Sequence, residues 1–336
     1  MDFRSDTVTL PTPAMREHML NAELGDDVYG DDPSVNALEQ YAASRHGFEA
    51  ALFTSSGTQA NLLALMSHCQ RGDEYICGQQ AHNYKYEAGG AAVLGSIQPQ
   101  PIDNEADGSL CLDKVKQAIK PDDAHFARTK LLSLENTIGG KVLDLAYLKQ
   151  AQQFCQQHHL QLHLDGARVY NAAVAANVDI TEIVKYFDSF TICLSKGLGA
   201  PVGSLLVGSQ GFINTARRIR KMLGGGMRQA GMLAAAGMYA LQNNVERLAE
   251  DHQNAQYLAA QLNTLPGFDT SRQPPQTNIV FVDVDAGIDI QTIAADLRAQ
   301  GIIITPGYQG MRLVTHLGID KSAIDTLIAA LKRHLS

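Results

Sequence analysis

Short apolar runs alternate with longer segments of helical apolar spacing between about residues 49 and 208. In segment 144–158, for example, apolar residues recur every three or four positions, as they do on one face of a helix. The expected strands are segments 50–53, 74–77, 130–134, 161–165 and 189–195, and the expected helices are segments 58–68 and 144–158. Such alternation favours a mostly parallel sheet with helices on both faces. An α/β fold is therefore predicted for this part of the chain.

The pattern changes after a long helical segment, 228–265, which ends at a Pro-Gly pair. Beyond it, the expected strands 278–282 and 311–316 alternate with the expected helices 289–300 and 321–335. We therefore predict a smaller C-terminal α/β domain. The predicted boundaries are 1–245 for the N-terminal segment with the large domain and 246–336 for the small domain. Thr12 followed by Pro13 predicts the start of a helix within the N-terminal segment, which could pack with either domain.

The charge balance and the cysteine pattern restrict the kinds of partner and compartment. With 27 Lys and Arg against 35 Asp and Glu, the net charge of −8 argues against general nucleic-acid binding, which needs a basic face. No run of about 18 apolar residues is present, so no membrane span is expected. The five cysteines lack a Cys-x-x-Cys pair, and the first residues form no apolar signal segment. These features predict reduced thiols and a cytoplasmic protein.

Two of the expected strands lead into charged residues that lie 31 positions apart, about the length of one strand–helix–strand unit. These residues are Asp165 and Lys196, and Lys196 opens a glycine-rich stretch, 197–203. Two parallel strands would present the acid and the amine at the same sheet edge, where α/β proteins place their sites. An amine that binds a cofactor covalently and a carboxylate that pairs with a pyridinium nitrogen are what pyridoxal 5′-phosphate needs. The competing interpretation is a solvated lysine and an ordinary turn aspartate.

Further parts of such a cofactor site are present. Turn 54–61 contains Gly57 and Thr58 and opens a helix, so its backbone N–H groups and the helix dipole favour a phosphate there. The competing interpretation is a plain N-cap turn. His82 follows the next expected strand and can stack on a pyridine ring or move a proton. Most of the 11 histidines must nevertheless be ordinary core or surface residues.

Metal ligation and carboxylate binding are less well determined by the sequence. Three histidines, His158, His159 and His163, could be considered as metal ligands. However, His158 and His159 are adjacent and point in different directions, and no further ligand has suitable spacing, so no metal site is predicted. Arginine suits bidentate capture of an amino-acid carboxylate. The candidates beside expected strand ends or turns, between which the sequence does not choose, are Arg4, Arg168 and Arg312.

Taken together, these segments resemble the low-specificity threonine aldolase family, which has the fold type I of enzymes that use pyridoxal phosphate. The resemblance extends over nearly the whole chain. The segments that carry it are 4–9, 25–33, 56–61, 81–84, 134–137, 163–168, 195–203, 224–229 and 312–316. One departure is visible, because the family often has a histidine where this chain has Ile138. That change is expected to affect the wall of the site and none of the cofactor-binding residues.

The resemblance implies a role for each of several residues. Lys196 would hold the cofactor covalently, Asp165 would keep the pyridinium nitrogen protonated, and His82 would stack on the ring. The implied phosphate ligands are Gly57 and Thr58, with Arg228 and Lys221 from a neighbouring subunit. The residues implied at the substrate carboxylate are Ser5, Arg168 and Arg312, and Arg168 is also counted in the cofactor site. His82 and His125 are implied at the substrate hydroxyl. Tyr29 is implied to approach from the partner chain, and Tyr86 and Glu87 to lie near the site.

The activity that the resemblance implies is reversible retro-aldol cleavage of L-allo-threonine or L-threonine to glycine and acetaldehyde. A homo-oligomer is also implied, a tetramer built as a dimer of dimers, with sites shared between subunits. The closeness of the resemblance favours L-allo-threonine. Two other classes share the central pair, Lys196 and Asp165: another fold type I enzyme, such as a β-eliminating lyase or a transaminase, and a protein that binds the cofactor without catalysis.

Overall fold

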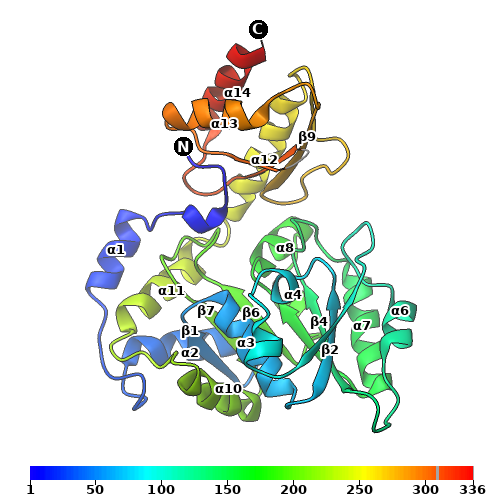
Figure 1. Ribbon diagram of the computed structural model, residues 1–336. Coiled ribbons are helices and arrows are strands. Elements are labelled where there is room, and N and C mark those ends of the chain that lie inside the picture. The colour runs from blue at the N-terminus through cyan, green and yellow to red at the C-terminus, as the bar shows by residue number, and fades with distance from the viewer. Residues whose placement is uncertain (308–309, 336) are drawn as a thin grey trace.

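The computed structural model describes residues 1–307 and 310–335 and contains two sheets, each packed with its own helices (Figure 1). The larger sheet has seven strands in the order β1-β7-β6-β5-β4-β2-β3. Its strands are β1 (Ala50–Thr54), β2 (Asp73–Gly78), β3 (Gln98–Ile102), β4 (Arg128–Glu135), β5 (Gln161–Asp165), β6 (Ser189–Cys193) and β7 (Ser204–Gly208). Strand β7 runs antiparallel to both neighbours, whereas β6, β5, β4, β2 and β3 pair in parallel. The predicted mostly parallel α/β sheet is confirmed.

Helices cover both faces of this sheet. Those of the large domain are α2 (Pro33–His46), α3 (Gly57–His68), α4 (His82–Lys85), α5 (Gly90–Val93), α6 (Leu112–Ala118), α7 (Leu145–His158), α8 (Val169–Ala176), α9 (Thr181–Val184), α10 (Gln210–Met222) and α11 (Gly231–Asn243). Strand β1 shows why both faces need helices: successive side chains of a strand point to opposite faces, and β1 carries apolar side chains on both. Leu52 packs with α3 and α10, and Phe53 packs in the core that includes α2 and α11.

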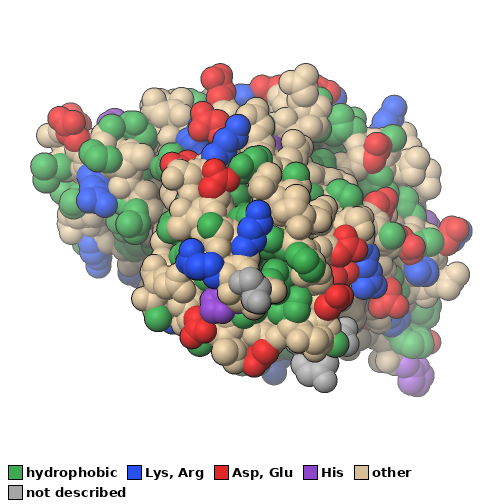
Figure 2. Space-filling view, turned by 90° about the horizontal axis from the view of Figure 1, so that it is seen from above, with side chains coloured by type: hydrophobic (Ala, Val, Ile, Leu, Met, Phe, Trp, Pro, Cys, Tyr) green, Lys and Arg blue, Asp and Glu red, His purple; other side chains and the backbone are tan. Residues whose placement is uncertain are grey.

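The smaller sheet is antiparallel throughout, with the order β10-β11-β9-β8. Its elements are α12 (Leu248–Leu262), β8 (Phe268–Asp269), β9 (Ile279–Val284), α13 (Ile290–Ala299), β10 (Thr305–Pro306), β11 (Gly310–Val314) and α14 (Lys321–Leu335). These elements bury a second hydrophobic cluster, separate from that of the larger sheet. The clusters support a division into two domains, and the boundary after residue 245 stays a prediction. From above, basic and acidic side chains are interspersed over this domain (Figure 2).

Three local expectations differ from the structure. The helical segment 228–265 is divided into α11 and α12, with residues 244–247 between them. Strand β3 is absent from the sequence-based expectation; it contains Pro99 and Pro101 and lies at the edge of the sheet, where proline is tolerated. Strand β7 was not expected either. It directly follows the glycine-rich stretch and forms a hairpin with β6.

The N-terminal segment packs with both domains. Phe3 is fully buried in the cluster of the small domain. Its N–H donates to the Ile303 carbonyl at 2.8 Å, and its own carbonyl accepts from the Val314 N–H at 2.8 Å. The chain then forms the short helix η1 (Asp6–Val8) and α1 (Pro13–Leu20), which packs on α11 of the large domain. The predicted helix start is confirmed, since Thr12 Oγ1 accepts from the N–H of Met15.

Gly166, directly after β5, is required by the close approach of β6. A Cβ at this position would lie 2.2 Å from the backbone carbonyl oxygen of Thr191. Gly166→Ala should therefore destabilise the protein by about 1–3 kcal/mol, because the backbone must shift. Gly211→Ala is the control, since nothing lies within 4 Å of its Cβ position. Urea unfolding of both variants is the measurement, and equal midpoints would contradict this explanation.

Candidate active site

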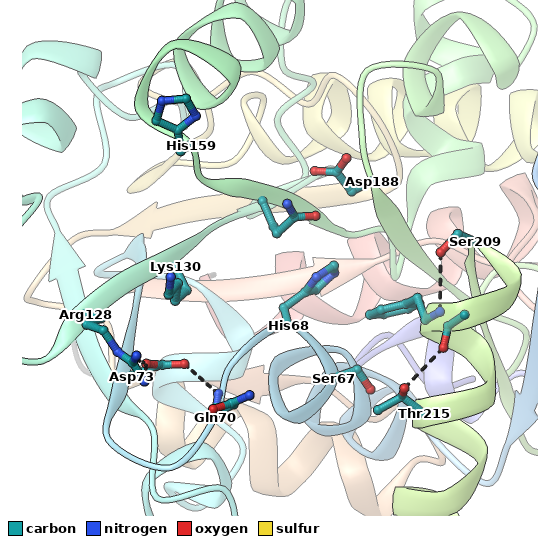
Figure 3. A pocket seen from close by; sticks show the side chains of 13 residues that line it. Ser67, His68, Gln70, Asp73, Arg128, Lys130, His159, Asp188, Ser209 and Thr215 are labelled. Atoms are coloured by element: carbon teal, nitrogen blue, oxygen red, sulfur yellow. Dashed lines mark hydrogen bonds and ion pairs between the residues drawn. The ribbon is translucent and has the colours of Figure 1, made fainter.

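Two cavities lie at opposite ends of the strands of the large sheet. One, of about 600 Å³, lies between the carboxyl ends of the parallel strands and the small domain, and both Lys196 and Arg312 line it. The other, of about 670 Å³, lies where β2 and β4 begin (Figure 3). Its walls carry charges of both signs, including an Asp73–Arg128 ion pair at 3.1 Å. The first cavity is lined by predicted cofactor- and substrate-binding residues and the second by none of them, so the first is the candidate active site.

Lys196 lies in the loop of the β6–β7 hairpin, three residues beyond the end of β6. The loop is closed by a hydrogen bond from the Leu194 N–H to the Gly203 carbonyl at 3.0 Å. A second bond, from the Gly199 N–H to the Lys196 carbonyl at 2.8 Å, fixes the backbone of the lysine itself. Within residues 1–307 and 310–335, no hydrogen bond or ion pair engages the Lys196 amine. The amine is therefore available to a ligand in the cavity.

Asp165 ends β5, the parallel neighbour of β6, so both predicted residues lie at one edge of the sheet. The Asp165 side chain is buried, and both of its oxygens accept hydrogen bonds. Oδ1 accepts from the Ala167 N–H at 3.0 Å, and Oδ2 accepts from Asn61 Nδ2 at 2.7 Å. Two donors to a buried carboxylate stabilise its charged form. A negative charge is what a pyridinium nitrogen needs opposite it.

His82 begins α4 and lines the same cavity. Its Nδ1 donates to Glu87 Oε1 at 2.8 Å, and its backbone N–H donates to Glu135 Oε2 at 2.8 Å. Glu87 Oε1 also accepts from Asn61 Nδ2 at 2.9 Å. The hydrogen bond to Glu87 raises the pKa of His82, against the lowering effect of burial. The imidazole is thus held by a carboxylate on one side and open to the cavity on the other.

Glu135 is a site residue that the sequence analysis did not single out. It ends β4 and lines the cavity. Burial, and next the negative charge of Asp165, raise the pKa of its carboxyl. Both effects favour the protonated form of Glu135. The signal that identified Lys196 and Asp165, a charged residue directly after an apolar strand, is present at Glu135 as well.

A largely buried ion pair between Asp6 and Arg168 forms the part of the site next to the small domain. Arg168 Nε donates to Asp6 Oδ2 at 2.8 Å, and Nη2 donates to Oδ1 at 2.7 Å. Asn278 of the small domain donates to Asp6 Oδ2 at 3.1 Å. Arg168 holds the pKa of the Asp6 carboxyl well below its usual range despite burial. Two donors of Arg168 are thus already engaged within the protein.

Arg312, on β11, is the arginine left free for a carboxylate. Among the residues that the structure describes, no acceptor or acid pairs with its guanidinium, which lines the cavity. Burial and then the charge of Arg168 lower the pKa of Arg312, so an anion in the cavity would relieve an unfavourable arrangement. Arg4, the third candidate, pairs instead with Asp2 at 2.6 Å on the surface.

The N-terminus of α3 fits a phosphate group. Gly57 and Thr58 form its first turn after the N-cap Ser56, as the sequence predicted for this turn. The Oγ of Ser204 is buried without a hydrogen-bond partner among the described residues, and it lies 3.6 Å from the position of a Cβ on Gly57. Asn61 follows Thr58 by about one turn, a rise of about 4.5 Å. One helix therefore carries both the phosphate-type turn and the amide that binds Asp165.

The remaining wall of the cavity combines polar and apolar residues. Ser5 lines it, and its Oγ accepts from the Thr7 N–H at 3.2 Å. Tyr86 is largely exposed, with its ring centre 5.7 Å from that of His82. Ile138, at the position of the departure from the family pattern, is a buried part of the wall, which also includes Ile279. Its position agrees with an effect on the wall.

Seven predicted residues do not line the cavity surface of their own chain: Gly57, Thr58 and Asp165 lie on α3 and β5, and four others are exposed elsewhere. The His125 side chain is 87% exposed on the loop after α6, where it bonds to Asp123 at 2.6 Å. Tyr29 is 77% exposed, and the Arg228 guanidinium carbon lies 5.8 Å from its ring centre. Lys221 is also exposed, near the end of α10. The structure of one chain thus does not bring these four residues to the site, and their roles stay predictions.

The chain has clear relatives among known proteins. A family model described as beta-eliminating lyase matches residues 2–286. Low specificity L-threonine aldolase of Escherichia coli K12 is 59% identical over 329 residues, which cover 98% of this chain and 97% of that protein. Low-specificity L-threonine aldolase 1 of Arabidopsis thaliana is 43% identical over 333 residues, covering 96% and 93%.

Solved structures agree with the sequence comparison. A putative aromatic amino acid beta-eliminating lyase/threonine aldolase from Exiguobacterium has a TM-score of 0.81 at 25% identity, covering 96% of this chain and 94% of that one. The fold and the site therefore define a lyase of the pyridoxal-phosphate-dependent, fold type I class. More narrowly, the chain belongs to the low-specificity L-threonine aldolase family, and the resemblance inferred from the sequence is confirmed.

Removing the charge of Asp6 should destabilise the fold. Asp6→Asn leaves the buried Arg168 guanidinium uncompensated, and breaking such a pair costs about 3–5 kcal/mol. Because the folded pKa of Asp6 is depressed, its contribution is present above the usual value of 3.8 and is lost as the pH falls further. The difference in unfolding free energy between wild type and variant should therefore shrink below about pH 4.

The control for this prediction is Asp2→Asn, which removes the partner of Arg4 in an exposed pair. Exposed pairs contribute at most about 1 kcal/mol, so this variant should unfold close to wild type. Denaturant titrations between pH 3 and 7 make the comparison. Similar losses for the two variants would show that the Asp6 pair does not have the predicted importance.

Proposed function

We propose that this chain cleaves L-threonine and L-allo-threonine to glycine and acetaldehyde, reversibly and with pyridoxal 5′-phosphate as cofactor. The observation that carries the proposal is that one cavity presents the amine of Lys196 and the guanidinium of Arg312, neither of which has a partner among the described residues. The amine suits a covalent link to the cofactor, and the guanidinium suits an amino-acid carboxylate. The high identity to proteins named threonine aldolases supports the same reaction.

The cofactor-binding residues are proposed from the fit of the site. Lys196 would hold pyridoxal phosphate covalently, Asp165 would keep its ring nitrogen protonated, and Gly57 and Thr58 would bind its phosphate. His82 would lie against the ring. When bound, the cofactor accepts the electron pair of the Cα–Cβ bond as that bond breaks.

The substrate would be oriented mainly by Arg312. Its planar guanidinium can bind the carboxylate through two parallel hydrogen bonds, which fixes the direction of the amino acid. Arg168 would assist with its remaining donor, since Asp6 occupies Nε and Nη2. Ser5 lies in the same cavity as a further polar contact. Alignment of the reacting bond by such contacts can contribute several kcal/mol to catalysis.

Removal of the β-hydroxyl proton requires a base in the cavity. His82 lines the cavity and is the base we propose, because an imidazole can accept a proton near neutral pH. His125 is the alternative left by the sequence, and it would need a different loop position or a partner chain to reach the hydroxyl. Glu135, whose protonated form is favoured by burial, would be the residue that supplies a proton in the same cavity.

The oligomer and the location are further parts of the proposal. We propose a tetramer in which Tyr29, Lys221 and Arg228 complete the site of a neighbouring subunit. Their exposure, and their absence from the walls of their own cavity, support this assignment. A preference for L-allo-threonine, a cytoplasmic location and a part in threonine breakdown and glycine formation complete it. No helix in the described part of the chain has the length and apolarity needed to cross a membrane.

The proposal is tested by acetaldehyde release from L-threonine and L-allo-threonine, with pyridoxal phosphate added to purified protein. We expect release from both, faster from L-allo-threonine. Lys196→Ala should abolish turnover because the covalent link is lost. A β-eliminating lyase would instead give pyruvate and ammonia, and a transaminase a keto acid. Either product without acetaldehyde, or full turnover by the variant, would refute the proposed reaction.

The assignment of Arg312 has a separate test. Arg312→Ala should raise the KM for the amino acid and leave cofactor affinity near that of wild type, because no cofactor contact is assigned to it. The loss of a charged, bidentate contact predicts an increase in KM of about tenfold or more. Arg4→Ala is the control, since its partner is a surface aspartate. Weakened cofactor binding with unchanged KM would place Arg312 at the phosphate instead.

A further inference from the structure

A hydrogen-bonded chain links His82 to Asp165 beneath the cavity. His82 Nδ1 lies 2.8 Å from Glu87 Oε1, and Asn61 Nδ2 donates both to that same oxygen, at 2.9 Å, and to Asp165 Oδ2, at 2.7 Å. A nitrogen of His82 and carboxylate oxygens of Glu87 and Asp165 all lie within 4.8 Å of one another. The cluster therefore joins the proposed base to the proposed partner of the cofactor ring.

The direction of these bonds determines the tautomer of His82. A carboxylate can only accept, so the proton between His82 and Glu87 belongs on Nδ1. In the neutral ring, the lone pair is then on Nε2. Within the described residues, Nε2 has no hydrogen-bond partner. The Glu87 side chain is 4% exposed and that of His82 is 42% exposed, so the acid lies behind the ring and the ring faces the cavity.

We propose that Glu87 is the positioning residue that orients the His82 ring and keeps its proton on Nδ1, leaving Nε2 as the proton acceptor in the cavity. The inference rests on the proposed role of His82 as base. Glu87 itself touches neither the cavity-lining surface nor a reacting atom, since it acts through the imidazole. Asn61 holds the Glu87 oxygen in place and thereby links the base to Asp165.

Other charged groups around His82 do not account for this arrangement. Asp165 raises the pKa of His82 as Glu87 does, whereas Lys196 lowers it. Glu135 accepts only the backbone N–H of His82, and burial favours its protonated form. Tyr86 makes a ring contact and no hydrogen bond to the imidazole. Glu87 is thus the one acid bonded to the side chain of His82 among the residues described.

The test uses Glu87→Gln in the holoenzyme. Asn61 donates to the same Oε1 that accepts from His82, so the glutamine carbonyl should face both donors and keep the ring orientation. Only the negative charge is lost, and the pKa of His82 should therefore fall. Nitrogen NMR of the histidine side chains, assigned with His82→Asn, measures that fall directly. In activity, the acid limb of the kcat/KM profile should move to lower pH.

A second variant separates orientation from charge. Glu87→Leu removes the acceptor altogether, so kcat should fall further than in Glu87→Gln, by about 10²-fold or more relative to wild type. The matched control is Glu182→Gln, a surface glutamate whose partner is Lys185, and it should change neither titration nor kcat. Circular dichroism and cofactor absorbance verify that each variant is folded and loaded.

The possible outcomes are distinct. An unchanged His82 titration in Glu87→Gln, or equal kinetic losses in the two Glu87 variants with no shift of the acid limb, would overturn the proposal and leave Glu87 a structural residue. A fall in the His82 pKa with a shifted acid limb supports it. If no acetaldehyde is formed by wild type, the proposed reaction fails, and the NMR titration still decides whether Glu87 controls the His82 ring.

Discussion

The buried pair of Asp6 and Arg168 is the interaction on which the site depends most. Asp6 comes from the N-terminal segment, Arg168 from the end of β5, and Asn278, which donates to the same carboxylate, from the small domain. A buried guanidinium without a partner is strongly unfavourable, so the N-terminal segment must return to the large domain for the chain to fold. The three parts of the chain therefore meet beside the cavity, and the pair defines where that cavity lies.

This pairing also distinguishes the roles of Arg168 and Arg312, between which the sequence does not choose. Arg168 is largely committed to Asp6, whereas Arg312 has no acidic partner among the described residues and faces the cavity. A guanidinium satisfied within the protein contributes to structure, and one left unsatisfied favours an incoming anion. Similar reasoning applies to the acids. Asp165 accepts two hydrogen bonds, whereas burial and a neighbouring charge favour protonation of Glu135.

The sequence predicts the features that depend on local patterns and misses those that depend on long-range contacts. Alternating strands and helices predict the sheet, and the charges at the end of strand 161–165 and directly after strand 189–195 predict that Asp165 and Lys196 lie at the same end of the sheet. Glu135 could have been found by the same rule. The Asp6–Arg168 pair joins residues 162 positions apart, and no spacing rule reveals it. Nor does the sequence show that His125 lies on an exposed loop in the single chain.

The residues proposed to bind the cofactor and the arginine proposed to bind the substrate belong to different domains. Lys196, Asp165 and the first turn of α3 are fixed to the large sheet and its helices, whereas Arg312 is carried by β11 of the small sheet. A change in the angle between the sheets alters the distance from Arg312 to Lys196 and leaves the distance from Lys196 to Asp165 unchanged. Affinity for the amino acid and retention of the cofactor are therefore separable traits. A substitution in the small sheet can therefore change the fit of the amino acid without altering a residue proposed to bind the cofactor.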